Sequence, residues 1–438
     1  MGLVKCCNFA AMKLNRFFLW TFMNMSVATV LAQDRTMTIA EVDSVLTHSN
    51  FQLQQAFLDI DVAEGQLVQA KKYENPEIQV MHNVQNPVNR KWLDTGYDGQ
   101  TDVQISQPIA VGGQRKNKVR QAEAILNATK SAYNAVLNDV RFEARTAFVD
   151  LYSVQQKLKV YDTEITSVEK ILKAHQEQME KGNISQMQTF RIAAMLSQLR
   201  SQKAEMLLEE NSLQKQLQIL LTQEDNSLIM AQLDDDDIVS NAVKNLARLQ
   251  PLASQSDSTE FQSIAKNHPE ILKMTYEQES ACQALKMEKS EALPHITING
   301  EWDKNGSIGH NFFAFGATVG VPLWNQNQGN IRTAKSQYAQ ATLSKIQKEK
   351  ELRASLLTLY RSTTQNLQLV ENQNQNLSAE LDRLLEAAEQ QFLKRNISVI
   401  EFVDLYSSYR DTKFQMIDSK AMLAKSNEEI NKLVGESL

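Results

Sequence analysis

The sequence predicts a mainly α-helical fold with a β-barrel part, built as a tandem repeat. The seven prolines of the 438-residue chain all lie outside two long stretches, 112–222 and 326–434, which are nearly free of glycine and rich in helix-forming residues. Two shorter stretches alternate apolar and polar residues, as strands do. The same order of elements then occurs twice along the chain, which indicates a duplication.

Composition excludes several classes of protein. The chain has 46 Lys and Arg against 52 Asp and Glu, a net charge of −6, so a nucleic-acid partner is not expected. Mean hydropathy is −0.39, and no run in the body of the chain reaches the roughly 18 apolar residues of a membrane-spanning helix. Hydrolase and phosphate-loop motifs are missing as well, so the sequence does not predict an enzyme.

The N-terminal segment differs from the rest of the chain. Three basic residues precede an apolar stretch, which predicts a secretory signal peptide over residues 1–32. The start codon of the protein could correspond to Met1 or to Met12. Cleavage would remove two of the three cysteines and leave Cys282, which we expect to be a packed residue that forms no intrachain disulfide.

Both long stretches are predicted to form helical hairpins with coiled-coil packing. In the first, apolar residues such as Ile125, Ala128 and Ala132 recur at three- and four-residue steps and form one apolar stripe. Each stretch is interrupted once, at residues 182–185 and 395–398, by a turn that contains Asn-Ile-Ser. A helix therefore stops, turns and resumes twice.

The two turns predict specific caps. Ser185 with Gln188, and Ser398 with Glu401, have the spacing of a capping box that starts the next helix. Gly182 suits the left-handed residue that follows a helix end, and in the second turn we expect Asn396 to take that conformation.

Strand pairs are predicted at about residues 76–109 and 294–323, with about ten residues per strand, the length of a tilted membrane-spanning β-strand. In the last strand, Phe313, Phe315 and Val319 share one face and are the candidate lipid-facing residues. A soluble hairpin with one buried face is the alternative. Because four such strands cannot close a barrel, several chains would have to share one.

The duplication divides the chain into a first repeat, 33–222, a polar linker, 223–258, and a second repeat, 259–438, with copies roughly 213 residues apart. A short helix is predicted before each strand pair, near Thr38 and near Thr259. The linker contains the acidic run 234–237, which we expect to be a solvated loop rather than a cation site.

Over residues 38 to 435 the chain resembles the TolC-like outer-membrane channels of bacterial tripartite efflux systems. The resemblance rests on the duplication, the two Asn-Ile-Ser turns and two strand-to-helix junctions, Ser106-Gln-Pro-Ile-Ala-Val-Gly-Gly-Gln-Arg115 and Val321-Pro-Leu-Trp-Asn-Gln-Asn-Gln-Gly329. The junctions are most similar to those of the heavy-metal branch, the CzcC-like and CusC-like channels.

The resemblance implies a homotrimer in the bacterial outer membrane. Four strands per chain would form a twelve-stranded barrel, and the helices would continue as an α-helical barrel across the periplasm. Such a channel is a passive exit duct for substrates, in this branch heavy-metal cations, that an inner-membrane RND-type pump delivers through a periplasmic adaptor protein. The alternative is an exported periplasmic coiled-coil scaffold or adaptor without channel activity.

The resemblance also implies site residues. Glu401 and Asp404 occupy the positions of the family's acidic gate, although Glu401 is also the capping-box acid and Asp404 could be an ordinary surface residue. The adaptor-contact tips would be Gly182, Asn183, Ile184, Ser185, Arg395, Asn396, Ile397 and Ser398.

No cofactor and no resident metal site are predicted. The six histidines form no i, i+4 pair, and the regular spacing of Met179, Met187 and Met195 is more typical of packing than of a Cu(I) path. Basic residues open the first long helix, and we expect either a solvated face or contact with lipid head groups or a neighbouring chain. That cluster comprises Arg115, Lys116, Lys118 and Arg120.

Overall fold

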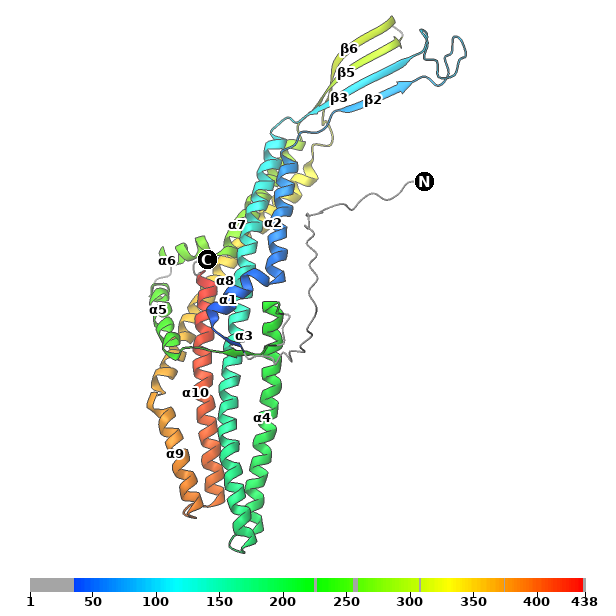
Figure 1. The fold of residues 1–438 in the computed structure, drawn as a ribbon. Coiled ribbons are helices and arrows are strands. Elements are labelled where there is room, and N and C mark those ends of the chain that lie inside the picture. Colours follow the sequence, from blue (N-terminus) through cyan, green and yellow to red (C-terminus); the bar gives the residue numbers. More distant parts are fainter. Residues whose placement is uncertain (1–34, 224–226, 255–258, 307–308, 374, 436–438) are drawn as a thin grey trace, which may run out of the picture.

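The computed structural model describes residues 35–223, 227–254, 259–306, 309–373 and 375–435, so the predicted signal peptide lies outside the described residues. The molecule is elongated, with a four-stranded sheet at one end and the turns of two helical hairpins at the other (Figure 1). None of the described helices is both long enough and apolar enough to cross a lipid bilayer.

The elements follow the duplicated order that the sequence predicts. In chain order they are β1 (Arg35–Met37), α1 (Ile39–Ser49), α2 (Phe51–Ala70), β2 (Glu77–His82), β3 (Thr101–Ile109), α3 (Gln114–Glu180), α4 (Gln186–Leu221), β4 (Ile229–Ala231), α5 (Asp235–Ser254), α6 (Thr259–Asn267), α7 (Pro269–Glu291), β5 (His295–Gly306), β6 (Gly309–Gly320), α8 (Gln328–Asn372), α9 (Gln375–Leu393) and α10 (Val399–Val434).

The long helices form one layer. In its upper half, next to the sheet, α3 packs between α2 and α7, and α7 packs against α8. In the lower half α3 pairs with α4 and α9 with α10, while α10 also packs against α3. The hairpins of the two repeats therefore lie against each other, with α3 as the shared element.

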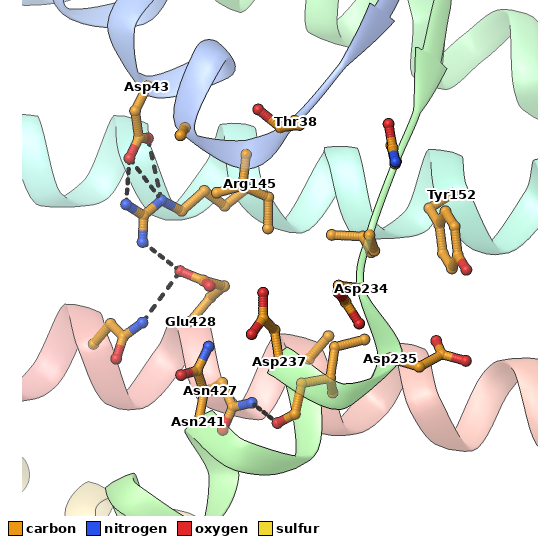
Figure 2. A pocket seen from close by; sticks show the side chains of 17 residues that line it. Thr38, Asp43, Arg145, Tyr152, Asp234, Asp235, Asp237, Asn241, Asn427 and Glu428 are labelled. Carbon is orange, nitrogen blue, oxygen red and sulfur yellow. Dashed lines mark hydrogen bonds and ion pairs between the residues drawn. The ribbon is translucent and has the colours of Figure 1, made fainter. Parts of the chain in front are cut away.

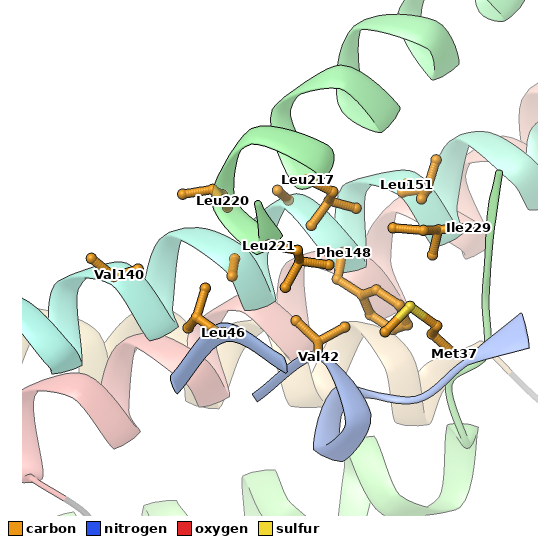
Figure 3. Packing of buried hydrophobic residues seen from close by; sticks show 12 residues of the cluster. Met37, Val42, Leu46, Val140, Phe148, Leu151, Leu217, Leu220, Leu221 and Ile229 are labelled. Atoms are coloured by element: carbon orange, nitrogen blue, oxygen red, sulfur yellow. The ribbon is translucent and has the colours of Figure 1, made fainter. Parts of the chain in front are cut away.

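Helix α1 and the small sheet brace the middle of this layer. β1 and β4 pair in parallel, and α1 begins with the predicted capping box, in which Thr38 and Glu41 exchange hydrogen bonds. Figure 3 shows the apolar cluster beneath them, where Val42 and Leu46 of α1 meet Phe148 of α3 and Leu217 of α4. All four side chains are fully buried, so this cluster holds the two ends of the first repeat together.

The acidic run lies at the start of helix α5, so the prediction of a loop is wrong. Asp235 to Asp237 form the first turn of this helix rather than a loop, although all three are solvent-exposed as expected. Ile238, Ala242, Leu249 and Leu252 of the same segment are buried against α8 and α10. Carboxylates at a helix N-terminus are stabilised by the helix dipole, which explains why an acidic run begins an amphipathic helix here.

The second long helical stretch is interrupted twice rather than once, which is a second correction. Helix α8 ends at Asn372 and α9 begins at Gln375, before the expected turn at 395–398. The sequence around this break, from Asn372 to Asn376, alternates Asn and Gln, and Asn is a poor helix former. The first stretch has no such break, and α3 runs for 67 residues.

Candidate functional site

The two hairpin turns lie side by side at the end of the molecule farthest from the sheet (Figure 1). In the first, the backbone N–H of Asn183 donates to the carbonyl of Gln178, and its side-chain amide donates to the Gln178 Oε1, both at 2.9 Å. In the second, Asn396 and Gln391 make the same two hydrogen bonds, at 2.9 and 2.6 Å. The Gln five residues before each Asn is therefore part of the turn, and its repetition in the sequence could have indicated it.

The left-handed residue of the second turn is Arg395, not Asn396 as predicted. Gly182 has φ of 71° and Arg395 has φ of 64°, and each donates its backbone N–H to the carbonyl three residues earlier, at 2.9 Å. The Asn396 side chain instead makes the hydrogen bond with Gln391 described above. The hydrogen bonds of the turn thus decide which residue takes the strained conformation, and they place it directly after the helix end.

The structure places the predicted adaptor-contact tips at the surface. Of the eight residues, Ile184 and Ile397 are partly buried, and the other six are exposed. Ser398 accepts from the Glu401 backbone N–H, and Glu401 accepts from the Ser398 backbone N–H at 2.7 Å, so the second capping box is complete. In the first turn Ser185 accepts from the Gln188 backbone N–H, but the structure has no reciprocal bond from Gln188.

The two predicted gate residues lie on one exposed face of α10. The capping hydrogen bonds from Ser398 lower the pKa of Glu401, so its carboxylate is ionised at neutral pH. Asp404 lies one turn further along and is exposed. Asp411, which the sequence reasoning missed, follows one heptad later on the same face with an exposed side chain. The heptad spacing from Asp404 was the signal that could have identified it.

On the buried side of α10, opposite this exposed face, a stack of aromatic rings fills the core of the hairpin. The rings of His175 and Phe392, Phe392 and Phe402, and Phe402 and Tyr406 pack at centroid distances of 4.9, 4.2 and 4.4 Å. Tyr406 donates to Glu389 at 2.7 Å, and its hydroxyl lies 2.6 Å from Ser167. These contacts join α3, α9 and α10, so they fix the position of the acidic face relative to the first hairpin.

Glu164 of α3 and Arg410 of α10 form a second link between the hairpins. The Glu164 side chain is fully buried, and the Arg410 Nη1 lies 3.5 Å from its Oε2. Neither carboxylate oxygen has a hydrogen-bond partner. Burial raises the pKa of Glu164 to about 7, and Arg410 offsets only part of that effect. The sequence reasoning missed this pair because it joins residues of different repeats.

The four-stranded sheet separates apolar from acidic residues. Its order is β2-β3-β5-β6, with every pair antiparallel. The register places Phe313 opposite Trp302 and Phe315 opposite Gly300, and Val319 lies on the same face. Phe313, Phe315 and Val319 are 74%, 82% and 51% exposed in the single chain. The opposite face carries Glu77, Asp102, Glu301 and Asp303. No Lys or Arg of the described strands lies on this face.

A pocket of about 760 Å³ lies beside α1 and α5, in the middle of the molecule (Figure 2). Arg145 of α3 crosses it to bind Asp43 of α1 and, at 2.7 Å, Glu428 of α10. Burial alone would lower the pKa of Arg145, but these two carboxylates raise it above its usual value. Asp234 and Asp237 also line the pocket. The pocket therefore belongs to the bracing between α1, α3 and α10.

The described residues contain no group of three or more His, Cys, Asp or Glu side chains arranged to hold a metal ion. Met187 is 65% exposed, whereas Met195 packs against the hairpin core, so the regularly spaced methionines do not share one environment. Cys282 is partly buried and forms no disulfide within the described part of the chain.

Comparison with known proteins gives consistent matches. A model of the outer membrane efflux protein family matches residues 44–223. The cobalt-zinc-cadmium resistance protein CzcC of Cupriavidus metallidurans is 22% identical over 77% of this chain and 72% of its own length. The crystal structure of CusC has a TM-score of 0.73 at 16% identity, covering 91% of this chain and 92% of that one. Campylobacter jejuni CmeC, an outer-membrane channel, gives 0.71 at 16% identity, covering 91% and 85%.

The sheet, the long helices and these matches define an outer-membrane channel of bacterial efflux systems that extends into the periplasm. The chain is similar to the outer membrane efflux protein family, and its similarity includes the heavy-metal branch with CzcC and CusC. The predicted fold class is confirmed, and the channel is favoured over the periplasmic scaffold. Proteins of this family are ducts that form trimers and work with adaptors and inner-membrane pumps.

Proposed function

We propose that three copies of this chain form an exit duct for cations, heavy-metal cations in particular, that an RND-type pump delivers through a periplasmic adaptor. The proposed gate consists of Glu401 and Asp404, with Asp411 extending it. The eight tip residues would contact the adaptor, and Phe313, Phe315 and Val319 would face lipid. The similarity to CzcC supports metal cations as substrates, since its name specifies cobalt, zinc and cadmium.

The observation that carries the proposal is the position of the acidic side chains. One face of the sheet carries four carboxylates and, among the described strand residues on that face, no Lys or Arg. One face of α10 carries three more carboxylates. Threefold repetition would place these carboxylates in rings around a common axis. Rings of carboxylates favour cations, and at a narrow point their mutual repulsion favours widening.

Conductance of the purified trimer in planar bilayers, under a KCl gradient, tests the gate. The double variant Glu401→Ala/Asp404→Ala is expected to lose most of the cation preference and to change the resting conductance severalfold. The corresponding first-repeat variant, Gln188→Ala/Arg191→Ala, is the matched control and is expected to behave as the wild type. Equal effects of the two double variants, or none from either, would show that the gate lies elsewhere.

Growth of a strain without the gene, complemented with wild type or the gate variant, tests the substrate. Cobalt, zinc and cadmium are expected to become toxic at lower concentrations in the deletion strain, whereas uncharged drugs should have little differential effect. A deletion strain that is sensitive to drugs but not to these cations would leave the duct in place and refute metal export.

A further inference from the structure

We propose that a cluster of basic side chains directly below the sheet binds anionic phospholipid head groups in the periplasmic leaflet of the outer membrane. The cluster, here termed the basic collar, consists of Lys116 and Arg120 near the start of α3 and Lys286 and Lys289 near the end of α7. This inference concerns the lipid around the channel and does not rest on the identity of the transported substrate.

All four side chains are available to a ligand. Each is solvent-exposed, and none forms an ion pair with another residue of the described chain. Helices α3 and α7 lie inside the upper layer, where each is flanked on both sides by helices of its own chain. A neighbouring copy would therefore meet α2 and α8 at the edges of the layer, not the collar. This removes the neighbouring chain as the natural partner of these residues.

The four residues share one side of the layer. On α3, Gln114 and Asn117 reach Ser290 of α7, and Arg115 donates to the carbonyl of Lys71 at the end of α2. At 3.6 residues per turn, Lys116 and Arg120 lie together on a face between these two directions. Lys118 lies on the opposite face.

The same reasoning applies to α7. Ser290 faces α3, whereas Gln278 and Glu288 contact α8 through Thr342 and Asn327. Lys286 and Lys289 lie on a face between them. Helices α3 and α7 are right-handed and run antiparallel. With 3.6 residues per turn, this face of α7 therefore lies on the same side of the layer as Lys116 and Arg120 of α3.

That side is the outside of the channel. Lower down the layer, α6 covers the same side of α8, where Arg353 lies over the ring of Phe261. An additional helix can pack outside a helical barrel without closing its lumen. The collar therefore points away from the lumen, at the level where the sheet ends.

The surroundings of the collar fit a membrane surface. Trp324, in the segment between β6 and α8, is 88% exposed, and exposed Trp side chains favour the head-group region of bilayers. Along the chain, Trp324 follows the exposed apolar residues Phe315 and Val319 of β6 and precedes α8. Moving from the sheet to the helices, the surface thus changes from apolar to aromatic to basic, which is the order that lipid tails and anionic head groups require.

The start of α3 gives an independent argument. Its first turn contains no acidic residue, although acids there would be stabilised by the helix dipole and cations are disfavoured. Arg115 and Lys116 occupy this turn instead, and Lys118 follows it directly. An external anion would compensate the unfavourable positive charge at the helix start.

Native mass spectrometry of the detergent-solubilised trimer tests the proposal, with dioleoyl phosphatidylglycerol and dioleoyl phosphatidylcholine as probes. The wild type is expected to retain more phosphatidylglycerol than phosphatidylcholine, and increasing salt should reduce the difference. The variant Lys116→Gln/Arg120→Gln should weaken phosphatidylglycerol binding about fivefold for each cation removed. Phosphatidylcholine binding should not change.

The matched control is Lys170→Gln/Lys173→Gln, which removes two exposed cations from the same helix far below the sheet. It should leave lipid binding unchanged. The exchange Lys116→Arg/Arg120→Lys keeps the charge, so it should retain the preference and would reveal any loss caused by misfolding. Equal binding of the two lipids by the wild type, or equal losses in collar and control variants, would overturn the proposal. Neither result depends on conductance or metal export, so it leaves the proposed function unaffected.

Discussion

The two helical hairpins reach their turns in different ways. α3 runs uninterrupted for 67 residues before the first turn, whereas α8 stops at Asn372 and α9 completes the second hairpin. Yet both turns have the same backbone and Gln–Asn hydrogen bonds. The helices that follow the turns differ in their first two turns. Gln188 and Arg191 of α4 correspond to Glu401 and Asp404 of α10.

This difference distinguishes residues that build the hairpins from residues that add negative charge. The backbone contacts of the turn are present in both repeats, so they serve the architecture common to both. The acids occur at these positions only in the second repeat, although the first repeat forms the same turn without them. The negative charge on α10 is therefore not required to build a hairpin, which favours a role in the channel. Substitutions at matched positions of the two repeats test this interpretation.

The largest effect is expected where the two hairpins are joined. Replacing Arg410 with Met should leave the buried Glu164 carboxylate without a counter-charge and destabilise the helical part by about 3–5 kcal/mol at pH 8. Guanidinium unfolding followed by circular dichroism measures this loss. Arg200→Met is the control, because Arg200 pairs with Glu169 at the surface and should contribute less than about 1 kcal/mol. Similar losses in both variants would mean that Glu164 and Arg410 do not couple the hairpins.

The same carboxyl group predicts a pH dependence. Its pKa of about 7 in the folded protein lies above the ordinary value of 4.5, because burial disfavours the charged form. Between these two values the folded protein binds the proton more tightly than the unfolded chain does. Stability should therefore fall as the pH rises from 4.5 to about 7, by about 3 kcal/mol, and then level off.

Comparing Glu164→Gln with the wild type isolates this contribution, because the amide does not titrate. The variant should lose most of the decline in the guanidinium unfolding midpoint between pH 5 and pH 8. Glu177→Gln, at an exposed position of the same helix, should keep it. A wild-type midpoint that is flat over this range, or one that rises, would contradict the assignment.

Local sequence signals predicted most of the fold, and the missed features depend on contacts between distant segments. Proline placement and periodicity located the hairpins and strands because helices and strands are determined largely by neighbouring residues. The sequence predicts a loop at the acidic run, because the burial of Ile238 and Leu249 depends on contacts with α8 and α10. The break between α8 and α9 does have a local signal, the Asn–Gln run at 372–376.

The candidate site was less predictable for the same reason. Glu401 and Asp404 could be identified only through the family resemblance, and Asp411 through heptad spacing. Glu164 could not be distinguished from a surface acid, since its burial requires Arg410 from the other repeat. In the second turn, Asn396 was the reasonable sequence choice for the left-handed residue. The hydrogen bonds with Gln391, visible only in the folded turn, assign that conformation to Arg395.

The smallest expected effects come from exchanging the left-handed residues of the two turns. Gly182→Ala should destabilise the first turn by about 1 kcal/mol, because a Cβ is disfavoured at φ of 71°. A Cβ at this position would meet no atom within 4 Å, so the cost arises from the backbone and not from a clash. Arg395→Gly should stabilise the second turn by a similar amount. Amide hydrogen exchange at Asn183 and Asn396 resolves the two turns separately. If both substitutions shifted exchange in the same direction, the two turns would not share the backbone requirement on which the comparison rests.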